Sequence, residues 1–378
     1  AASDVYKRQR LYNAKKSIMV SDSECLAQLK NSTPRLLNLL AGFSQVEVLV
    51  VGDLTLDEFI TGQVERISRE APVLILRHET TERVPGGGAN AVYNFAKLGA
   101  KVRVVGLLGK DEQGMALRQI FESAGVDTSG ILIDYHRPTV TKTRISGHAR
   151  QSVTQQVVRV DRKSDDLPDV GLQLQLADKI RQQVGTVSAV VCSDYGDGVL
   201  SKQAIEASIS DSHRTIVDTQ KNLELYRGAS LFTPNLLEAE KAVGYTISNF
   251  GSLYRAGRDL LELTDAQQIL ITRGEEGISL FDRQVPSQFS PPALTISGNG
   301  GSNIYCWHIP AFSRTDVFDV TGAGDTVVAA LTLALGAGAS TWEATVMGNL
   351  AASVVVRKFG TATTTVDELR DTLGVLVG

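Results

Sequence analysis

Residues 319–326 read Asp-Val-Thr-Gly-Ala-Gly-Asp-Thr and lead directly into the apolar, alanine-rich run 327–335. This order predicts a glycine-rich turn that opens a helix, because Gly322 and Gly324 let the backbone turn tightly and approach a ligand. The first N–H groups of a helix have no intrahelical partner and lie at the positive end of the helix dipole. The stretch therefore predicts an anion-binding helix start.

Asp325 falls in the first turn of this predicted helix, beside the place where an anion would bind. A carboxylate there has a chemical use if it accepts a proton from an attacking hydroxyl group. It could instead only cap the helix, with the glycines forming an ordinary turn. The octapeptide alone leaves both interpretations open.

Composition places the chain among ordinary globular proteins. It has 378 residues, 43% hydrophobic and 21% charged, with a formal net charge of −4. Such a balance favours neither nucleic acid nor an anionic membrane as a partner. No apolar run reaches the roughly 20 residues that span a bilayer, and the three cysteines lack metal-ligand spacing. We expect a cytoplasmic protein without a disulfide framework.

The N-terminal segment differs from the rest of the chain. Residues 1–20 show no hydrophobic period, and residues 21–42 have helix-spaced leucines with an interruption at Pro34. We therefore expect a partly helical or disordered extension over 1–44 and one domain over 45–378.

Strand-like and helix-like runs alternate through that domain. Residues 46–53 form a short β-branched run that ends in Gly52-Asp53, which is typical of a buried parallel strand. Similar runs lie at 102–106, 187–192, 215–218, 231–235 and 268–274. Repeated βα units predict an α/β fold with a doubly wound, mostly parallel sheet flanked by helices. The Ser, Pro and Gly-rich stretch 287–303 predicts a surface loop.

Two further motifs can carry chemistry. Three glycines at 86–88 precede a helix-like run that contains Asn90 and ends at Gly99. Asn235 and Glu238 are three residues apart, so they share one helical face. An amide and a carboxylate suit hydrated magnesium and its phosphates, but the same pair also suits a capping box at a helix start.

These motifs together resemble the two signatures of the PfkB, or ribokinase-like, carbohydrate kinases, and the resemblance covers roughly residues 46–370. It implies in-line phosphoryl transfer from ATP to a sugar hydroxyl. Asp325 would accept or orient the hydroxyl proton, and the N–H groups of Gly322, Ala323 and Gly324 would hold the phosphoryl oxygens. No Walker A motif is present, which argues against a P-loop enzyme.

The resemblance also implies roles for other residues. Sugar contacts are implied for Asp57, Gly86, Gly87, Asn90 and Asp194. ATP contacts are implied for Asn235, Glu238, Thr272, Arg273, Gly274, Gly277 and Asn349, with Asn235 and Glu238 acting on Mg²⁺, partly through water. A monovalent cation is a further candidate cofactor. The partly polar strands at about 57–80 and 138–161 resemble the small β lid of these kinases, which implies a homodimer formed through the lid.

Several stretches are similar to one subgroup, the D-glycero-β-D-manno-heptose 7-phosphate kinases of lipopolysaccharide precursor synthesis. They are 52–57, 66–73, 138–144, 193–195 and 317–326. The implied acceptor is the anomeric hydroxyl of a sugar that already carries a phosphate. Lys142 and Arg144 are candidates for that phosphate, or are solvated lid charges. The chain departs from the subgroup at Asp197 and near 218–220, where lysines are usual.

Other interpretations remain open at this level. A fructokinase-type or ribokinase-type sugar kinase is an alternative within the family, and a non-catalytic sugar or nucleotide sensor is an alternative outside it. Two-domain members of the subgroup append a nucleotidyltransferase after the kinase. We expect that second reaction to come from another polypeptide.

Overall fold

The computed structural model describes residues 22–149, 154–210, 212–298, 301–313, 317–358 and 360–378. The irregular segment expected at 1–20 lies outside the described residues. The chain divides into two compact units. Unit 1 comprises Ala1–Gln45 and Arg227–Gly378, and unit 2 comprises Val46–Tyr226.

Unit 2 is built on parallel strands in the order β9-β8-β1-β4-β5. The strands are β1 (Glu47–Gly52), β4 (Lys101–Gly109), β5 (Asp127–Asp134), β8 (Ala189–Asp194) and β9 (Thr215–Thr219). The helices are α3 (Gly88–Lys97), α4 (Glu112–Ser123), α5 (Val170–Arg181) and α6 (Lys202–Ser210). Val48, Leu49, Val50 and Val51 of β1 are fully buried, as a strand covered on both faces requires. This confirms the buried strand predicted from residues 46–53.

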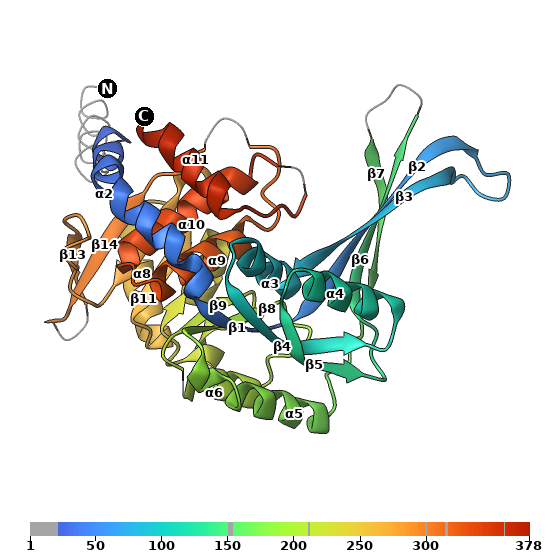
Figure 1. Ribbon diagram of the computed structural model, residues 1–378, viewed down its shortest axis with the longest axis horizontal. Coiled ribbons are helices and arrows are strands. Elements are labelled where there is room, and N and C mark those ends of the chain that lie inside the picture. The colour runs from blue at the N-terminus through green and yellow to red at the C-terminus, as the bar shows by residue number, and fades with distance from the viewer. Residues whose placement is uncertain (1–21, 150–153, 211, 299–300, 314–316, 359) are drawn as a thin grey trace. The chain divides into compact units, whose positions relative to one another are not determined.

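A second, four-stranded sheet forms the lid of unit 2, in the order β3-β2-β6-β7. Its strands are β2 (Leu54–Ile67), β3 (Leu74–Gly87), β6 (Val140–His148) and β7 (Gln155–Arg162). β2 pairs antiparallel with β3 and parallel with β6, and β6 pairs antiparallel with β7. Figure 1 shows β2 and β3 running side by side as a long arm.

Unit 1 contains strands in the order β13-β14-β12-β11-β10. They are β10 (Leu231–Phe232), β11 (Gln268–Thr272), β12 (Ile278–Asp282), β13 (Leu294–Ser297) and β14 (Asn303–Ile309). β10 and β11 are parallel, whereas β12, β13 and β14 join antiparallel. The expectation of a plain loop over 287–303 is wrong where β13 forms, because this alternating segment pairs with β14 as an edge strand.

The helices of unit 1 include two almost wholly buried ones, α9 (Ala323–Gly336) and α10 (Thr341–Val355). The others are α2 (Asp22–Gly42), α7 (Leu236–Val243), α8 (Phe250–Thr264) and α11 (Val366–Val377). These elements confirm the predicted fold class, a mostly parallel α/β sheet flanked by helices with a small β lid. Among the described residues, no helix is long and apolar enough to cross a membrane.

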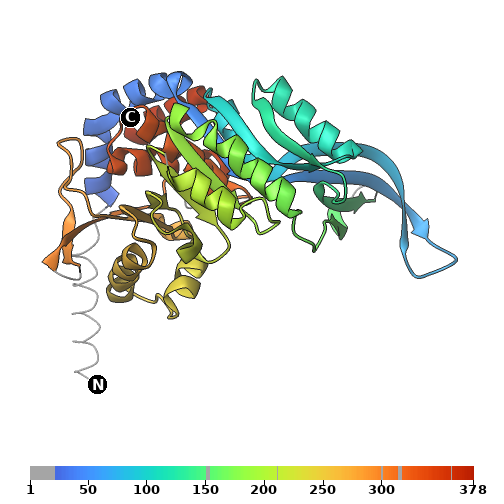
Figure 2. The same cartoon turned by 90° about the horizontal axis from the view of Figure 1, so that it is seen from below.

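Helix α2 runs through Pro34 without a break, so the expected interruption is wrong. Tertiary packing accounts for this, because Leu29, Leu36 and Leu40 are each at most 1% exposed. Arg35 adds an ion pair to the buried Glu343 at 2.8 Å and lies over the Phe289 ring at 3.8 Å. Figure 2 shows α2 beside the C-terminal helices, and α2 contacts α9 and α11. The helix is thus part of the core of unit 1.

We predict that Leu36→Ala lowers the free energy of unfolding by about 2–5 kcal/mol, because it removes a fully buried side chain and leaves a cavity. Leu26→Ala on the same helix is the control, since Leu26 is 38% exposed and should cost much less. Urea denaturation of both variants measures the difference. Equal small effects would show that α2 does not belong to the folded core.

Candidate active site

The carboxylate of Asp53 holds the loop that follows β8 in unit 2. Asp53 follows β1 and is 1% exposed. Its Oδ2 accepts backbone N–H groups of Tyr195, Gly196 and Asp197 at 2.9, 2.8 and 3.0 Å, and its Oδ1 accepts that of Val199 at 3.0 Å. Burial, and next the Asp194 charge, raise the pKa of Asp53 to about 6. The residue therefore holds the loop that follows β8.

Asp194 lies at the end of β8 and is also buried. Its Oδ2 accepts the hydroxyls of Thr219 at 2.9 Å and Tyr226 at 2.8 Å, and its Oδ1 accepts the N–H of Gly196 at 2.9 Å. These internal bonds tie β8 to β9 and to the segment Leu223–Tyr226. In this geometry the carboxylate positions the surrounding loop.

The predicted glycine turn joins β3 to α3. Gly87 has φ +52° and precedes the first residue of α3. A Cβ at Gly86 would come within 2.7 Å of the Asp57 carboxylate, so this position accepts only glycine without movement. Asn90, in the first turn of α3, is 1% exposed and accepts the Asn94 side-chain amide at 3.1 Å. The turn thus brings Gly86 against Asp57 of β2, two residues that were predicted to bind sugar.

The two predicted basic lid residues have different surroundings. Arg144 forms an ion pair with Asp57, with Nη1 and Oδ1 3.0 Å apart, and lies 5.2 Å from the Phe59 ring centre. Lys142 carries its ammonium group 5.8 Å from the Tyr195 ring centre. Arg144 is therefore paired with the Asp57 carboxylate, whereas the Lys142 ammonium group lies beside Tyr195 in the loop after β8.

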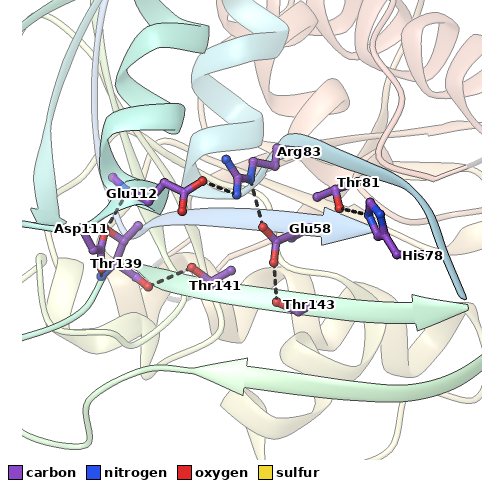
Figure 3. A network of polar contacts seen from close by, with 10 residues as sticks. Glu58, His78, Thr81, Arg83, Asp111, Glu112, Thr139, Thr141 and Thr143 are labelled. Atoms are coloured by element: carbon purple, nitrogen blue, oxygen red, sulfur yellow. Dashed lines mark hydrogen bonds and ion pairs between the residues drawn. The ribbon is translucent and has the colours of Figure 1, made fainter. Parts of the chain in front are cut away.

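The face of the lid sheet opposite to Asp57 and Arg144 is bonded to helix α4, as Figure 3 shows. Arg83 donates to Glu58 at 2.9 Å and to Glu112 of α4 at 2.8 Å, and Thr143 donates to Glu58 at 3.0 Å. Hydrogen bonding to Glu112 and then to Glu58 raises the pKa of Arg83.

Asp111 fixes the start of β6 beside the same network. Its Oδ2 accepts the Thr139 N–H at 2.8 Å, and its Oδ1 accepts the Thr139 hydroxyl at 2.6 Å. It also caps α4 through the Gly114 N–H at 2.8 Å. Asp111 thus ties the start of β6 to the start of α4.

In unit 1, α9 begins as the glycine pattern predicts. Gly322 precedes the helix with φ +77°. Apart from the chain neighbours and the helix backbone itself, no heavy atom of the described residues lies within 4 Å of a Cβ built on Gly324. Asp319 fixes the turn before α9. Its Oδ1 accepts the Thr321 N–H at 2.9 Å, and its Oδ2 accepts the Gly360 N–H at 3.1 Å. Asp325, 4% exposed, lies in the first turn of α9, beyond Ala323. A helix start with open space at its glycine fits an anionic ligand.

Asn235 and Glu238 form the capping box of α7. The Asn235 Oδ1 accepts the Glu238 N–H at 3.0 Å, and the Glu238 Oε2 accepts the Asn235 N–H at 2.8 Å. Burial raises the pKa of Glu238. A carboxylate has about four lone-pair positions, so this bond leaves acceptor capacity for a water of hydrated magnesium. The capping interpretation is confirmed, and the residues also fit an indirect metal contact.

Residues 272–277 form a tight turn between β11 and β12. The N–H of Arg273 donates to the Gly277 carbonyl at 2.8 Å, and Gly274 and Gly277 have φ +57° and +85°. Thr272 forms a bridge with Asn235, which brings the turn beside the start of α7. The Arg273 side chain is 6% exposed and donates to the Glu276 carbonyl at 3.0 Å. These predicted ATP contacts therefore share one end of the strands of unit 1.

A half-buried cluster of polar and aromatic side chains lies beside this turn. His308 hydrogen-bonds through Nδ1 with the Ser279 hydroxyl at 2.8 Å and through Nε2 with the Tyr254 hydroxyl at 3.1 Å. The Phe250 ring lies 4.9 Å from His308 and 5.9 Å from the Arg273 guanidinium. Burial, and next the Arg273 charge, lower the pKa of His308 to about 4.

Asn349 lies within α10 and is 4% exposed. Its side-chain amide donates to the Pro310 carbonyl at 2.7 Å, which fixes the segment after β14. Among the residues that the structure describes, no group of three His, Cys, Asp or Glu side chains could hold a metal ion directly.

Residues 46–368 match the family model described as pfkB family carbohydrate kinase. The chain belongs to the pfkB family of carbohydrate kinases. It is 40% identical over 342 residues to the bifunctional protein HldE of Geobacter metallireducens, covering 89% of this chain and 65% of that protein. It is 39% identical over 345 residues to HldE of Pseudomonas aeruginosa, covering 90% and 65%. The chain thus spans less than two thirds of the length of these relatives.

Solved structures show the same fold. An Arabidopsis thaliana ribokinase complexed with ribose and ATP superposes with a TM-score of 0.61 at 19% identity, covering 88% of this chain and 98% of that one. Phosphofructokinase-2 from Escherichia coli in complex with potassium gives a TM-score of 0.67 at 18% identity, covering 88% and 99%. At these identities the likeness concerns the fold alone.

The predicted residues of this kinase separate cleanly between its units. Every residue with an implied sugar contact is in unit 2, and every residue with an implied ATP contact is in unit 1 together with Asp325. Sequence reasoning identified Asp53 only as the end of a strand, and it did not consider Arg162 and Lys163, which line a polar cavity of unit 2. The basic end of β7, Arg159-Val160-Asp161-Arg162-Lys163, is the signal that could have found the last two.

We predict that His308 makes the kinase sensitive to acid. Its folded pKa of about 4 lies below the ordinary 6.5, so its contribution is complete above pH 6.5 and is lost as the pH falls through about 4. Between about pH 7 and pH 4, the wild type should lose up to about 3 kcal/mol more unfolding free energy than His308→Gln. Urea denaturation at a series of pH values measures this. Parallel curves for the two proteins would contradict it.

Proposed function

We propose that this kinase transfers the γ-phosphoryl group of ATP to the anomeric hydroxyl of D-glycero-β-D-manno-heptose 7-phosphate, giving the 1,7-bisphosphate. The product is a precursor of ADP-heptose and of the lipopolysaccharide core. The observation that carries the kinase assignment is the start of α9, where Gly322, an open Gly324 and the buried Asp325 come together. The subgroup resemblance and the HldE relatives support the choice of sugar.

Unit 1 supplies the phosphoryl-transfer groups in this proposal. The N–H groups at Gly322, Ala323 and Gly324 hold the transferring phosphoryl oxygens. The sugar oxygen bonds to the γ-phosphorus as the bond to the β–γ bridging oxygen breaks, ADP leaves, and Asp325 takes or orients the hydroxyl proton. The turn at 272–277 and Asn349 are assigned to nucleotide binding. Positioning supplies most of the rate, so Asp325 need not be a strong base.

Magnesium, when bound, neutralises the phosphate charge during transfer. Asn235 and Glu238 are the residues proposed to hold it, through water, because their capping box leaves oxygen lone pairs available. A monovalent cation is proposed as a further requirement.

Unit 2 binds the sugar in this proposal. Asp57 and Asn90 bond sugar hydroxyls beside the bare backbone of Gly86 and Gly87. Arg144 then orients Asp57 through their 3.0 Å ion pair. Asp194 acts indirectly, because its oxygens already accept protein hydrogen bonds. Lys142 is assigned to the sugar phosphate.

A homodimer through the lid is part of the proposal. Every residue of β7 is exposed, and Val157, Val158 and Val160 are 45–52% exposed. Apolar side chains on an extended strand favour burial against a partner. We also propose that the reaction occurs in the cytoplasm, as the composition led us to expect.

The acceptor assignment is tested by ADP release over a panel of sugars. We expect efficient turnover with heptose 7-phosphate and little with ribose, fructose or unphosphorylated heptose. Turnover of ribose or fructose with none of heptose 7-phosphate would move the protein to another branch of the family. Nucleotide binding without turnover of any sugar would favour a sensor.

Asp325→Asn should fold and bind ATP as the wild type does but lose most of its turnover, by about a hundredfold or more, because positioned proton transfer contributes on the order of 10²–10⁴ in rate. Steady-state kinetics and ATP titration measure the two properties separately. Val375→Asn is a control, since Val375 is 83% exposed in α11. A near-wild-type kcat for Asp325→Asn would remove its assigned role.

A further inference from the structure

A polar cavity of about 200 Å³ lies within unit 2, beside the Asp57–Arg144 pair of the lid. It is lined by Val140, Thr141, Lys142, Asp161, Arg162, Lys163, Tyr195, Asp197 and Gln220. The lining combines the start of β6 and the end of β7 with the loops after β8 and β9. A cavity of about 150 Å³ accommodates benzene, so this one has room for a phosphate monoester group.

Three cationic side chains, Lys142, Arg162 and Lys163, line the cavity. They come from adjacent strands, because Thr141 pairs with Arg162 and Lys142 pairs with Asp161. A fourth cation, Lys221, packs on Gly196 next to this wall, since its Cε would lie 2.1 Å from a Cβ at Gly196. Guanidinium and ammonium groups together supply the charge-assisted donors that a phosphate dianion needs.

The two carboxylates of the cavity are not equivalent. Asp161 receives two hydrogen bonds from Arg159, at 2.7 and 2.6 Å, and these bonds are the main reason that its pKa is lowered. Its charge is thus offset by a cation outside the lining. Asp197 has a raised pKa because burial outweighs the attraction of Lys163, Lys142, Arg137 and Lys221. Outside the lining, Lys163 also lies 3.8 Å from the exposed Asp165, and Arg162 interacts electrostatically with Asp111. Within the lining, three cations face Asp197 and the already bonded Asp161.

We propose that this cavity binds the phosphate of the acceptor sugar, with Arg162 and Lys163 joining Lys142 as donors and Asp197 limiting the affinity for phosphate. The proposal rests on the proposed function and specifies its acceptor as a sugar phosphate. Asp197 faces the same cavity, so its oxygens accept a hydroxyl of the sugar next to the phosphate. The cavity then selects a phosphate that is attached to a polyol.

The experiment compares two variants whose expected effects have opposite signs. Arg162→Gln with Lys163→Gln removes two donors and should weaken binding of heptose 7-phosphate by about tenfold or more, because one charge-assisted bond of 1.5 kcal/mol or above corresponds to about a decade. Asp197→Asn removes the opposing charge and should strengthen binding of inorganic phosphate severalfold. Isothermal titration calorimetry of the full chain measures both, and ATP affinity should not change in either variant.

Arg181→Gln with Lys202→Gln is the matched control. It removes the same charge from exposed side chains of α5 and α6, which are 49% and 85% exposed. We expect wild-type binding of heptose 7-phosphate. An equal loss in the control would assign the effect to overall charge and overturn the cavity assignment.

The possible failures separate the two proposals. If the wild type binds and phosphorylates heptose 7-phosphate but the Arg162/Lys163 variant binds it equally well, only the cavity assignment is wrong. If the wild type phosphorylates only unphosphorylated sugars, both the proposed acceptor and the cavity assignment are wrong. Weaker phosphate binding in Asp197→Asn would overturn the role of Asp197. Because Arg162 and Lys163 are exposed, their variant tests the donors even if Asp197→Asn fails to fold.

Discussion

The buried carboxylate of Asp53 is the constraint on which the loops of unit 2 depend. It accepts four backbone N–H groups from the loop after β8, and that loop carries Tyr195 and Asp197 into the cavity. Each buried N–H left without an acceptor would cost about 1–3 kcal/mol. Its own backbone carbonyl also accepts the Gly88 N–H at 3.0 Å, at the start of α3. One residue therefore fixes both loops that are proposed to surround the sugar.

Unit 1 uses the same device with a different aspartate. Asp319 accepts the N–H groups of Thr321, within the turn before α9, and of Gly360, which is 41 residues away in the sequence. These two hydrogen bonds fix the backbone just before the helix start. Electrostatic stabilisation of a transition state depends on such preorganised dipoles, since they need no reorientation during the reaction. In each unit, one aspartate, Asp53 or Asp319, thus fixes backbone N–H groups close to the proposed ligand.

The local parts of this arrangement could be predicted from the sequence. The glycine turn before α9 and the capping box of α7 depend on residues within a few positions of one another, and both formed as expected. The structural role of Asp53 could not be predicted, because its hydrogen-bond partners lie 142–146 residues away. The predictions of a helix break at Pro34 and of a loop over 287–303 were wrong because they relied on local sequence alone. Their local signals were overridden by core packing of α2 and by strand pairing of β13.

The mixture of cations and a carboxylate in the cavity suits product release as well as substrate binding. Lysine and arginine side chains gathered without a counter-charge repel one another and would retain any phosphorylated product strongly. Asp197 offsets part of that charge from inside the cavity, at the cost of burying a carboxylate, which is why its pKa is raised. Binding that is equal for substrate and transition state does not raise kcat. A carboxylate among the cations therefore suits an enzyme that must hold a phosphate for positioning and then release it.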